Sequence, residues 1–294
     1  MQDIIYGSMN VDQRFAASFA PNLYHEAWMI PGVTYSTQYQ NGVAGGYQVH
    51  KYKKEDTIVP GKPGRDFTHE NAEDDLVSIV LNNNFMKSRK LYGVAKNAIE
   101  APAAEELLAD TTKLAKESIN GSGLAALATE ATTFGTKGAV DKDNIKDAIL
   151  DVRAALASKG ASSAKIILAS PGAYSAFLGA AGKDFTNGRN ENIQGTGVIR
   201  DWYGFTIVEA SQLGASGSLA YYNYAGTLKT ATSTVLNNIN FLVYDYRAFS
   251  ALTNLEVFRL IDGGKDFNGV LAQVEVNMGY RVTNPDLVYA HIKE

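Results

Sequence analysis

The last part of the chain carries its clearest secondary-structure signal. In the stretch VLAQVEVNM, residues 270–278, apolar side chains alternate with Gln273, Glu275 and Asn277. A period of two is typical of a strand with one buried face. Residues 240–246, 255–261 and 287–292 also read as strands, with turns at 262–264 and at Asn284-Pro285. The final sixty residues therefore predict antiparallel strands.

The middle of the chain has a helical period. A helix is predicted over residues 102–119, because Pro102 suits its first turn and apolar residues follow at helical spacing. The glycines of Asn120-Gly121-Ser122-Gly123 are expected to end it. A second helix is predicted from Asp141, as N-cap, to Lys159-Gly160. Its buried face is expected to hold Ile145, Ala148, Ile149, Val152 and Leu156.

Residues 165–182 predict a buried strand, then Ser170 as a helix cap, Pro171 at the first helical position and a short helix. Residues 183–197 are polar and glycine-rich and predict a loop. Strands are expected at 201–211 and 218–223. Helices and strands thus occupy separate stretches, which predicts an α+β fold instead of an alternating one.

The first 85 residues predict extended structure. Residues 1–46 show little periodicity and read as an arm whose partners lie outside its own core; the alternative is an irregular leader packed on the same subunit. Residues 47–54 and 76–85 read as two strands around the polar stretch 55–75, which makes a long hairpin. Loops of this length are uncommon in compact domains unless they are functional or disordered.

Composition excludes several classes of function. The chain has 294 residues, no cysteine and a net charge of −4. Disulfides and thiolate chemistry are therefore absent. The net negative charge gives no indication of nucleic-acid binding. The amino terminus does not resemble a secretory signal, and no apolar run is long enough to span a membrane.

No catalytic or metal-binding pattern stands out. His25, His50, His69 and His291 lack metal-ligand spacing. The stretch GSGLAA, residues 121–126, matches a dinucleotide fingerprint in letters, but a helix precedes it where the fingerprint needs a strand. The acidic cluster Glu70, Glu73, Asp74 and Asp75 lacks calcium-loop spacing and reads as a solvated hairpin flank. No cofactor and no metal are expected.

The order of these elements resembles the Hong Kong 97 type major capsid protein of tailed bacteriophages. Two stretches carry the resemblance: IILASPGAYSAFL, followed after a loop by NIQGTGVIRDWYGFTIVEASQL, and the ending GYRVTNPDLVYAHIK. Asp286-Leu287 departs from the apolar residue that often follows the proline in the family. The resemblance implies an N-terminal arm at 1–46, an E-loop at 47–85, a P-domain with a spine helix at 86–135, an A-domain at 136–231 and P-domain strands at 232–294.

The resemblance also implies a function. The chain would be a non-enzymatic shell protein that assembles with itself into hexamers and pentamers of an icosahedral head. That head would form in the host bacterial cytoplasm and enclose double-stranded DNA without sequence-specific binding. A separate scaffolding protein and a portal are expected partners, and a membrane is not. Lysine–asparagine cross-links occur in some relatives, but no matching partners for Lys51, Lys53, Lys54 and Lys62 are evident here.

Candidate inter-subunit contacts are a set of charged residues, and one asparagine, in the hairpin and in the loop after the short helix. In the family, the loops that follow the short helix meet around the symmetry axes of the shell. The hairpin tips lie over adjacent subunits. The candidates are Lys51, Lys53, Lys54, Lys62, Arg65, Asp66, Glu73, Asp74, Asp75, Asp184, Arg189, Asn190 and Glu191.

Other functions remain open from the sequence. An encapsulin-like shell of a cellular nanocompartment would share this fold and differ in its content. A small α/β enzyme would place its chemistry in residues 136–231 and show perturbed acids, bases or nucleophiles at strand ends. A tail-tube or adhesion protein would form rings or fibres.

Overall fold

The structure is a computed structural model that describes residues 28–37, 47–52, 74–92, 102–133, 138–161, 165–184, 202–214, 217–262 and 269–294. The fold is α+β, as predicted, and divides into two compact units. The first includes Phe85–Ser118 and Leu255–Val276, and the second includes His25–Asn84, Ile119–Asn254 and Asn277–Glu294. Several long elements contribute residues to both units.

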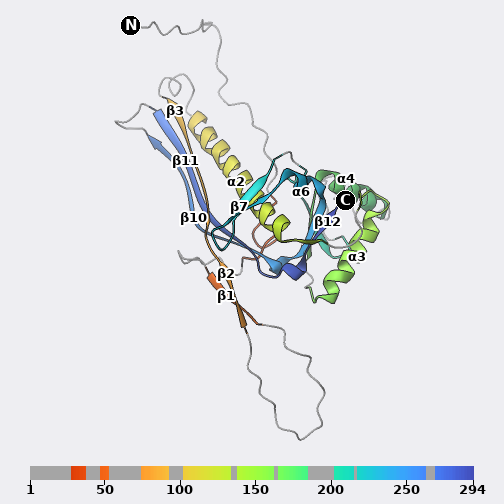
Figure 1. Cartoon of the computed structure of the whole chain (residues 1–294). Helices are drawn as coiled ribbons and strands as arrows, with labels where there is room; N and C mark the ends of the chain where they lie inside the picture. The colour runs from red at the N-terminus through yellow and green to blue at the C-terminus, as the bar shows by residue number, and fades with distance from the viewer. Residues whose placement is uncertain are drawn as a thin grey trace, which may run out of the picture. The chain divides into compact units, whose positions relative to one another are not determined.

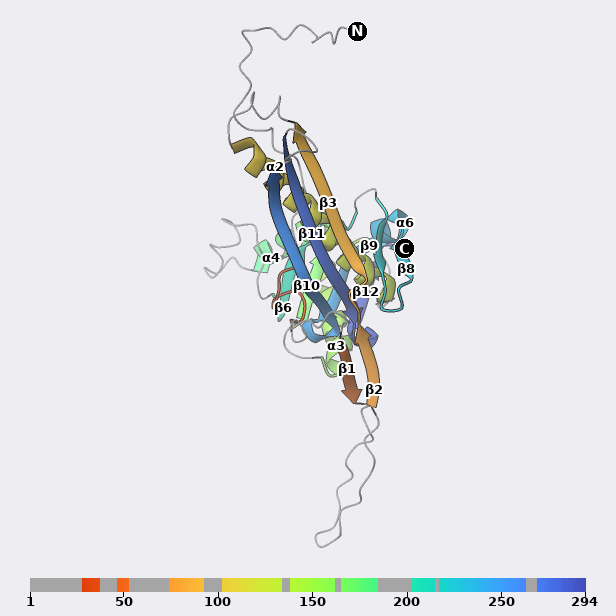
Figure 2. The same cartoon turned by 90° about the vertical axis from the view of Figure 1, so that its left-hand side faces the viewer.

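The first unit contains a three-stranded sheet. Its strand order is β10 (Phe249–Asp262), β11 (Gly269–Val282) and β3 (Asn83–Tyr92). The alternating burial predicted for residues 270–278 is confirmed along β11. The first part of α2 (Pro102–Glu130) lies along one face of this sheet (Figures 1 and 2). Arg89 on β3 forms an ion pair with Asp110 on α2.

The predicted end of the first helix is wrong, because α2 continues to Glu130. Gly121 and Gly123 are packing positions instead of a helix stop. A Cβ at Gly121 would lie 3.0 Å from Leu219 Cδ2, and one at Gly123 would lie 2.6 Å from Met29 Sδ. Glycine destabilises a helix interior by about 1 kcal/mol relative to alanine, and here it allows this close approach.

The second unit is built on a five-stranded mixed sheet. Its order is β4 (Thr132–Thr133), β12 (Val288–Ile292), β9 (Ile239–Asp245), β5 (Lys165–Ala169) and β6 (Phe205–Glu209). β5 is parallel to β6 and antiparallel to β9. The sheet therefore joins strands on both sides of the expected border at residue 231.

Helices α3 (Ile145–Ser158) and α4 (Pro171–Asp184) pack against this sheet (Figure 1). The buried side of α3 is as predicted for Ile145, Ile149, Val152 and Leu156, which are enclosed, while the predicted Ala148 is only partly buried. They join Phe177 of α4 and Phe205 and Phe241 of the sheet in one core cluster. Burial of this apolar surface holds the layers together.

The helix boundaries agree in part with the sequence prediction. Ser170 precedes α4, and its hydroxyl accepts a hydrogen bond from the Ala173 N–H at 3.4 Å, as predicted. The close of α3 at Lys159-Gly160 is also confirmed. Asp141 does not cap α3, whose N-cap is Asn144. The Asp141 carboxylate instead accepts from the N–H groups of Asp143 and Asn144 in the preceding turn.

Residues 28–37 pack on their own chain. Trp28 is 1 % exposed, and its ring lies 6.3 Å from that of Phe249. Its Nε1 donates to the carbonyl oxygen of Asn120. The hydroxyl of Tyr244 donates to the carbonyl oxygen of Thr34 at 2.6 Å. This part of the leader therefore follows the alternative of a segment packed on the same subunit. The rest of residues 1–46 lies outside the described residues.

Two hairpins complete the second unit. The long hairpin is present as β1 (Tyr47–Tyr52) paired antiparallel with β2 (Asp74–Ile79). Its second limb does not run to residue 85 as predicted, because the chain leaves the strand at residues 80–82 and begins β3. The second hairpin pairs β7 (Leu219–Tyr222) with β8 (Leu228–Ala231), and α6 (Ser233–Asn238) follows it. The sequence did not predict β8 or α6.

Candidate inter-subunit surfaces

The β1–β2 hairpin brings some of the predicted contact residues into register. Lys51 pairs with Asp75 across the two strands, and Tyr52 pairs with Asp74. The backbone thus places one basic and one acidic candidate opposite each other at this end of the ladder.

The other predicted contact residues are not brought together by the described structure. Asp184 is the last residue of α4. Lys53, Lys54, Lys62, Arg65, Asp66, Glu73, Arg189, Asn190 and Glu191 lie outside the described residues. Their role in contacts between subunits stays a prediction.

Sequence reasoning did not single out the β7–β8 hairpin. The pairs Ala220–Thr230 and Tyr222–Leu228 place four uncharged residues on one face, and all four are exposed. The pairs Leu219–Ala231 and Tyr221–Lys229 lie on the other face, where Tyr221 and Ala231 are buried. The turn signal Asn223-Tyr-Ala-Gly226 could have located this hairpin, since Gly226 has φ +72° and the Asn223 side chain accepts from the N–H groups of Ala225 and Thr227.

Side chains from elsewhere in the second unit hold the backbone of this hairpin. Asn83 Oδ1 accepts from the Tyr222 N–H at 2.7 Å, and Asn83 Nδ2 donates to the Tyr222 carbonyl at 2.9 Å. Asn82 Nδ2 donates to the Asn223 carbonyl at 2.7 Å. The hydroxyl of Ser122 donates to the Ala220 carbonyl at 2.8 Å. A two-stranded hairpin is marginal alone in water, so these bonds fix its position.

A polar cluster lies beneath the hairpin at the end of α2. The hydroxyl of Tyr221 donates to Glu130 Oε1 at 3.0 Å. Burial raises the pKa of Glu130, against the lowering effects of that hydrogen bond and of the charges of Arg281 and Lys229. Burial also raises the pKa of Tyr221 to about 12. The Arg281 guanidinium lies 4.0 Å from the centre of the Tyr224 ring, a cation–π contact.

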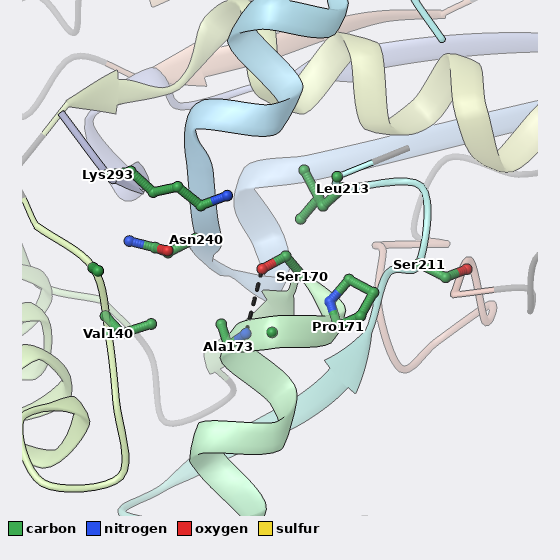
Figure 3. A pocket seen from close by; sticks show the side chains of 11 residues that line it. Val140, Ser170, Pro171, Ala173, Ser211, Leu213, Asn240 and Lys293 are labelled. Carbon is green, nitrogen blue, oxygen red and sulfur yellow. Dashed lines mark hydrogen bonds between the residues drawn. The ribbon is translucent and has the colours of Figure 1, made fainter. Parts of the chain in front are cut away.

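A cavity of about 530 Å³ lies at the start of α4 (Figure 3). Its polar side chains mostly bind the backbone of the chain itself. Lys293 Nζ donates to the Asn237 carbonyl at 2.6 Å, and Asn240 Nδ2 donates to the Gly138 carbonyl at 2.8 Å. Ser170 caps α4. These bonds are structural, and the described lining contains no acid–base pair beside a nucleophile.

Within the described ranges, no group of three or more His, Asp or Glu residues could hold a metal ion. His291 is buried against the Phe241 ring, with ring centroids 4.8 Å apart, and its Nδ1 lies 3.0 Å from Asn240 Nδ2. His50 belongs to β1, while His25 and His69 lie outside the described residues. Among the described helices, none is long and apolar enough to cross a membrane.

Comparison with known proteins rests on structure alone, because no family model and no curated protein sequence matches the chain. The capsid structure of the cyanophage P-SCSP1u matches with a TM-score of 0.71 at 13 % identity, over 95 % of this chain and 92 % of that one. The mature capsid of bacteriophage PhiM1 matches with a TM-score of 0.65 at 14 % identity, over 95 % and 91 %. The chain has the Hong Kong 97 type capsid fold.

A third structure with this capsid fold is the head of the Helicobacter pylori bacteriophage KHP40. It matches with a TM-score of 0.66 at 12 % identity, over 98 % of this chain and 96 % of that one. The similarity therefore covers nearly the whole length of both chains in each case. The fold predicted from the order of elements is confirmed.

Proposed function

We propose that the chain is the major capsid protein of a tailed bacteriophage, a non-catalytic subunit that assembles into hexamers and pentamers of an icosahedral shell. The observation that carries this proposal is that the chain matches phage capsid structures over nearly its whole length, with TM-scores of 0.65–0.71. A catalytic domain grafted on a shared core would leave part of the chain unmatched. Here 95 % or more of it is matched.

The β1–β2 hairpin fits such a role. Its residues 47–52 and 74–79 form a ladder around a polar connection of more than twenty residues, which is long for a connection within a compact domain. In the proposed shell this hairpin is the E-loop, and its charged residues contact a neighbouring subunit. Exposed ion pairs contribute well under about 1 kcal/mol each, so they become effective only when a closed symmetric assembly repeats them many times.

The remaining parts of the proposal follow from the same fold. The expected domain ranges, a separate scaffolding protein, a portal and assembly in the host cytoplasm belong to it. The net charge of −4 is consistent with a shell that confines DNA and does not bind its phosphates strongly.

The test is assembly of the full chain, expressed alone and with scaffolding candidates from the same genome. Size-exclusion chromatography and negative-stain microscopy should reveal pentamers, hexamers or closed particles tens of nanometres across. A stable 31.7 kDa monomer under every condition would overturn the proposal. Particles filled with a cellular protein instead of DNA during infection would identify a nanocompartment.

A matched pair of variants tests the hairpin itself. Reversal of both charges in Lys53→Glu/Lys54→Glu should lower particle yield, because these positions belong to the proposed E-loop. The control Lys142→Glu/Lys159→Glu changes net charge equally at two exposed positions flanking α3. Equal losses in the two variants would mean that net charge, and not the hairpin, limits assembly.

A further inference from the structure

The β7–β8 hairpin exposes an apolar cross-strand pair. Tyr222 and Leu228 are directly paired and retain 46 % and 53 % of their surface. Ala220 and Thr230, the next pair on the same face, are also exposed. This outer face, defined by these four residues, carries no charge.

The outer face of the hairpin departs from the usual polarity of a solvated sheet face. A sheet with one solvated face normally directs its polar residues outward and its apolar residues toward the core. The inner face follows that rule, because it buries Tyr221 and Ala231, while its Lys229 is exposed. The outer face has no charged residue, and its two large side chains, Tyr222 and Leu228, are aromatic or apolar.

The backbone of the hairpin is held firmly despite this exposure. Asn82, Asn83 and Ser122 bond its backbone at four positions between Ala220 and Tyr224. A surface that is already ordered loses less conformational entropy when a partner binds. Five hydrogen bonds to an otherwise solvated hairpin are consistent with a surface prepared for contact.

We propose that this outer face, centred on Tyr222 and Leu228, is a contact site for a second copy of the chain in the assembled particle. The inference rests on the proposed function and deepens it by assigning one contact surface. An uncharged face does not suit nucleic acid, whose binding depends on cationic side chains. The face suits a partner that offers apolar side chains.

The size of the face points to a repeated contact between copies. Four side chains fall far short of the roughly 1,000 Å² that an isolated stable interface buries. Such a contact is useful where each subunit makes several contacts at once, as in a closed shell. The chain also exposes apolar side chains on other elements, namely Leu150 on α3 and Phe258 and Leu260 on β10. A head-to-tail contact between two different faces of the same chain therefore has candidates on both sides.

The test compares the double variant Tyr222→Thr/Leu228→Thr with two controls. Threonine retains strand propensity and removes the large apolar surface. Val235→Thr removes an apolar side chain of similar exposure, 45 %, from α6. Tyr222→Phe/Leu228→Ile keeps the outer face apolar. Each full-length variant is measured for melting temperature before assembly and for particle yield.

We expect the threonine double variant to lower particle yield about tenfold while its melting temperature changes little. Both controls should assemble like the wild type. Hydrogen exchange of the wild-type chain supplies a measurement independent of any variant. The amides of residues 219–231 should be more protected in particles than in unassembled protein.

The outcomes separate this inference from the proposed function. If wild-type particles form, and the threonine variant assembles equally well with no added protection of the hairpin, the inference is overturned and the proposed function stands. If no particle forms under any condition, both are overturned. An outer face that gains protection only when a different virion protein is added contradicts a second copy as the occupant.

Discussion

Gly279 on β11 lies against the backbone of Val80, so closely that a Cβ at position 279 would be 2.5 Å from the Val80 carbonyl oxygen and 2.9 Å from its carbon. Real Cβ atoms do not approach backbone this closely, so the contact requires glycine. Val80 follows β2, at the point where the chain turns from the long hairpin toward β3. The contact therefore positions the end of β2 against β11.

Replacement of Gly279 by alanine should destabilise the protein by about 2–3 kcal/mol, because a backbone carbonyl cannot move aside as a side-chain end can. Gly172→Ala is the matched control, since it lies in the first turn of α4 with open space around its added Cβ. That control should be neutral or stabilising by up to about 1 kcal/mol. Urea unfolding of the unassembled chain measures both, and equal stabilities would contradict the steric argument.

Trp28 should be the main anchor of the segment 28–37. Trp28→Ala should cost about 3–5 kcal/mol, because the side chain is almost fully buried beside Phe249. Trp28→Phe keeps an aromatic ring and loses the Nε1 bond to the Asn120 carbonyl, so a smaller loss is expected. Denaturant midpoints rank the three proteins. A loss below about 1 kcal/mol for the alanine variant would show that the segment contributes little to stability.

The parts of the fold that the sequence predicted well are those governed by local periodicity. The buried face of α3 and the alternation along β11 follow from side-chain spacing alone. Ser170 and Pro171 marked the start of α4 because capping is also local. The end of α2 was missed because Gly121 and Gly123 are required by close contacts with Leu219 and Met29, which are distant in sequence.

The candidate contact surfaces were predicted less completely. Charge in the long hairpin led to Lys51 and Asp75, and strand pairing placed them opposite each other. The outer face of the β7–β8 hairpin was missed because an alternating strand does not reveal which of its faces is solvated. The tertiary structure shows it, because Tyr221 is buried while Tyr222 is exposed.

Acid should destabilise the chain through His291. Burial lowers the pKa of His291 below its ordinary value of 6.5, so the unfolded chain binds a proton at a higher pH than the folded chain. Stability is therefore fully present above about pH 6.5 and is lost as pH falls toward the folded pKa. His291→Phe cannot titrate and can keep the stacking on Phe241. Melting temperatures between about pH 7.5 and pH 5.5 should fall less in this variant than in the wild type. Parallel curves would exclude His291 as the cause.

Glu130 should have the opposite pH dependence. Burial raises the pKa of Glu130 above its ordinary value of 4.5, which means that the folded chain holds this proton more tightly than the unfolded chain. The stability that the protonated form contributes is present at low pH and is lost as pH rises from about 4.5 through the folded pKa. Glu130→Gln remains neutral and retains an oxygen that can accept from the Tyr221 hydroxyl.

The Glu130→Gln variant should therefore be more stable than the wild type near neutral pH, by a margin that shrinks toward about pH 4.5. Asp151→Asn, at an exposed position on α3, removes the same charge and should not reproduce that pattern. Urea unfolding at several pH values measures the difference. A Glu130→Gln variant that is less stable than the wild type at neutral pH would mean that the attraction of Arg281 and Lys229 for the carboxylate outweighs its burial. The hairpin would then be held in place by charge, instead of tolerating a carboxylate beneath it.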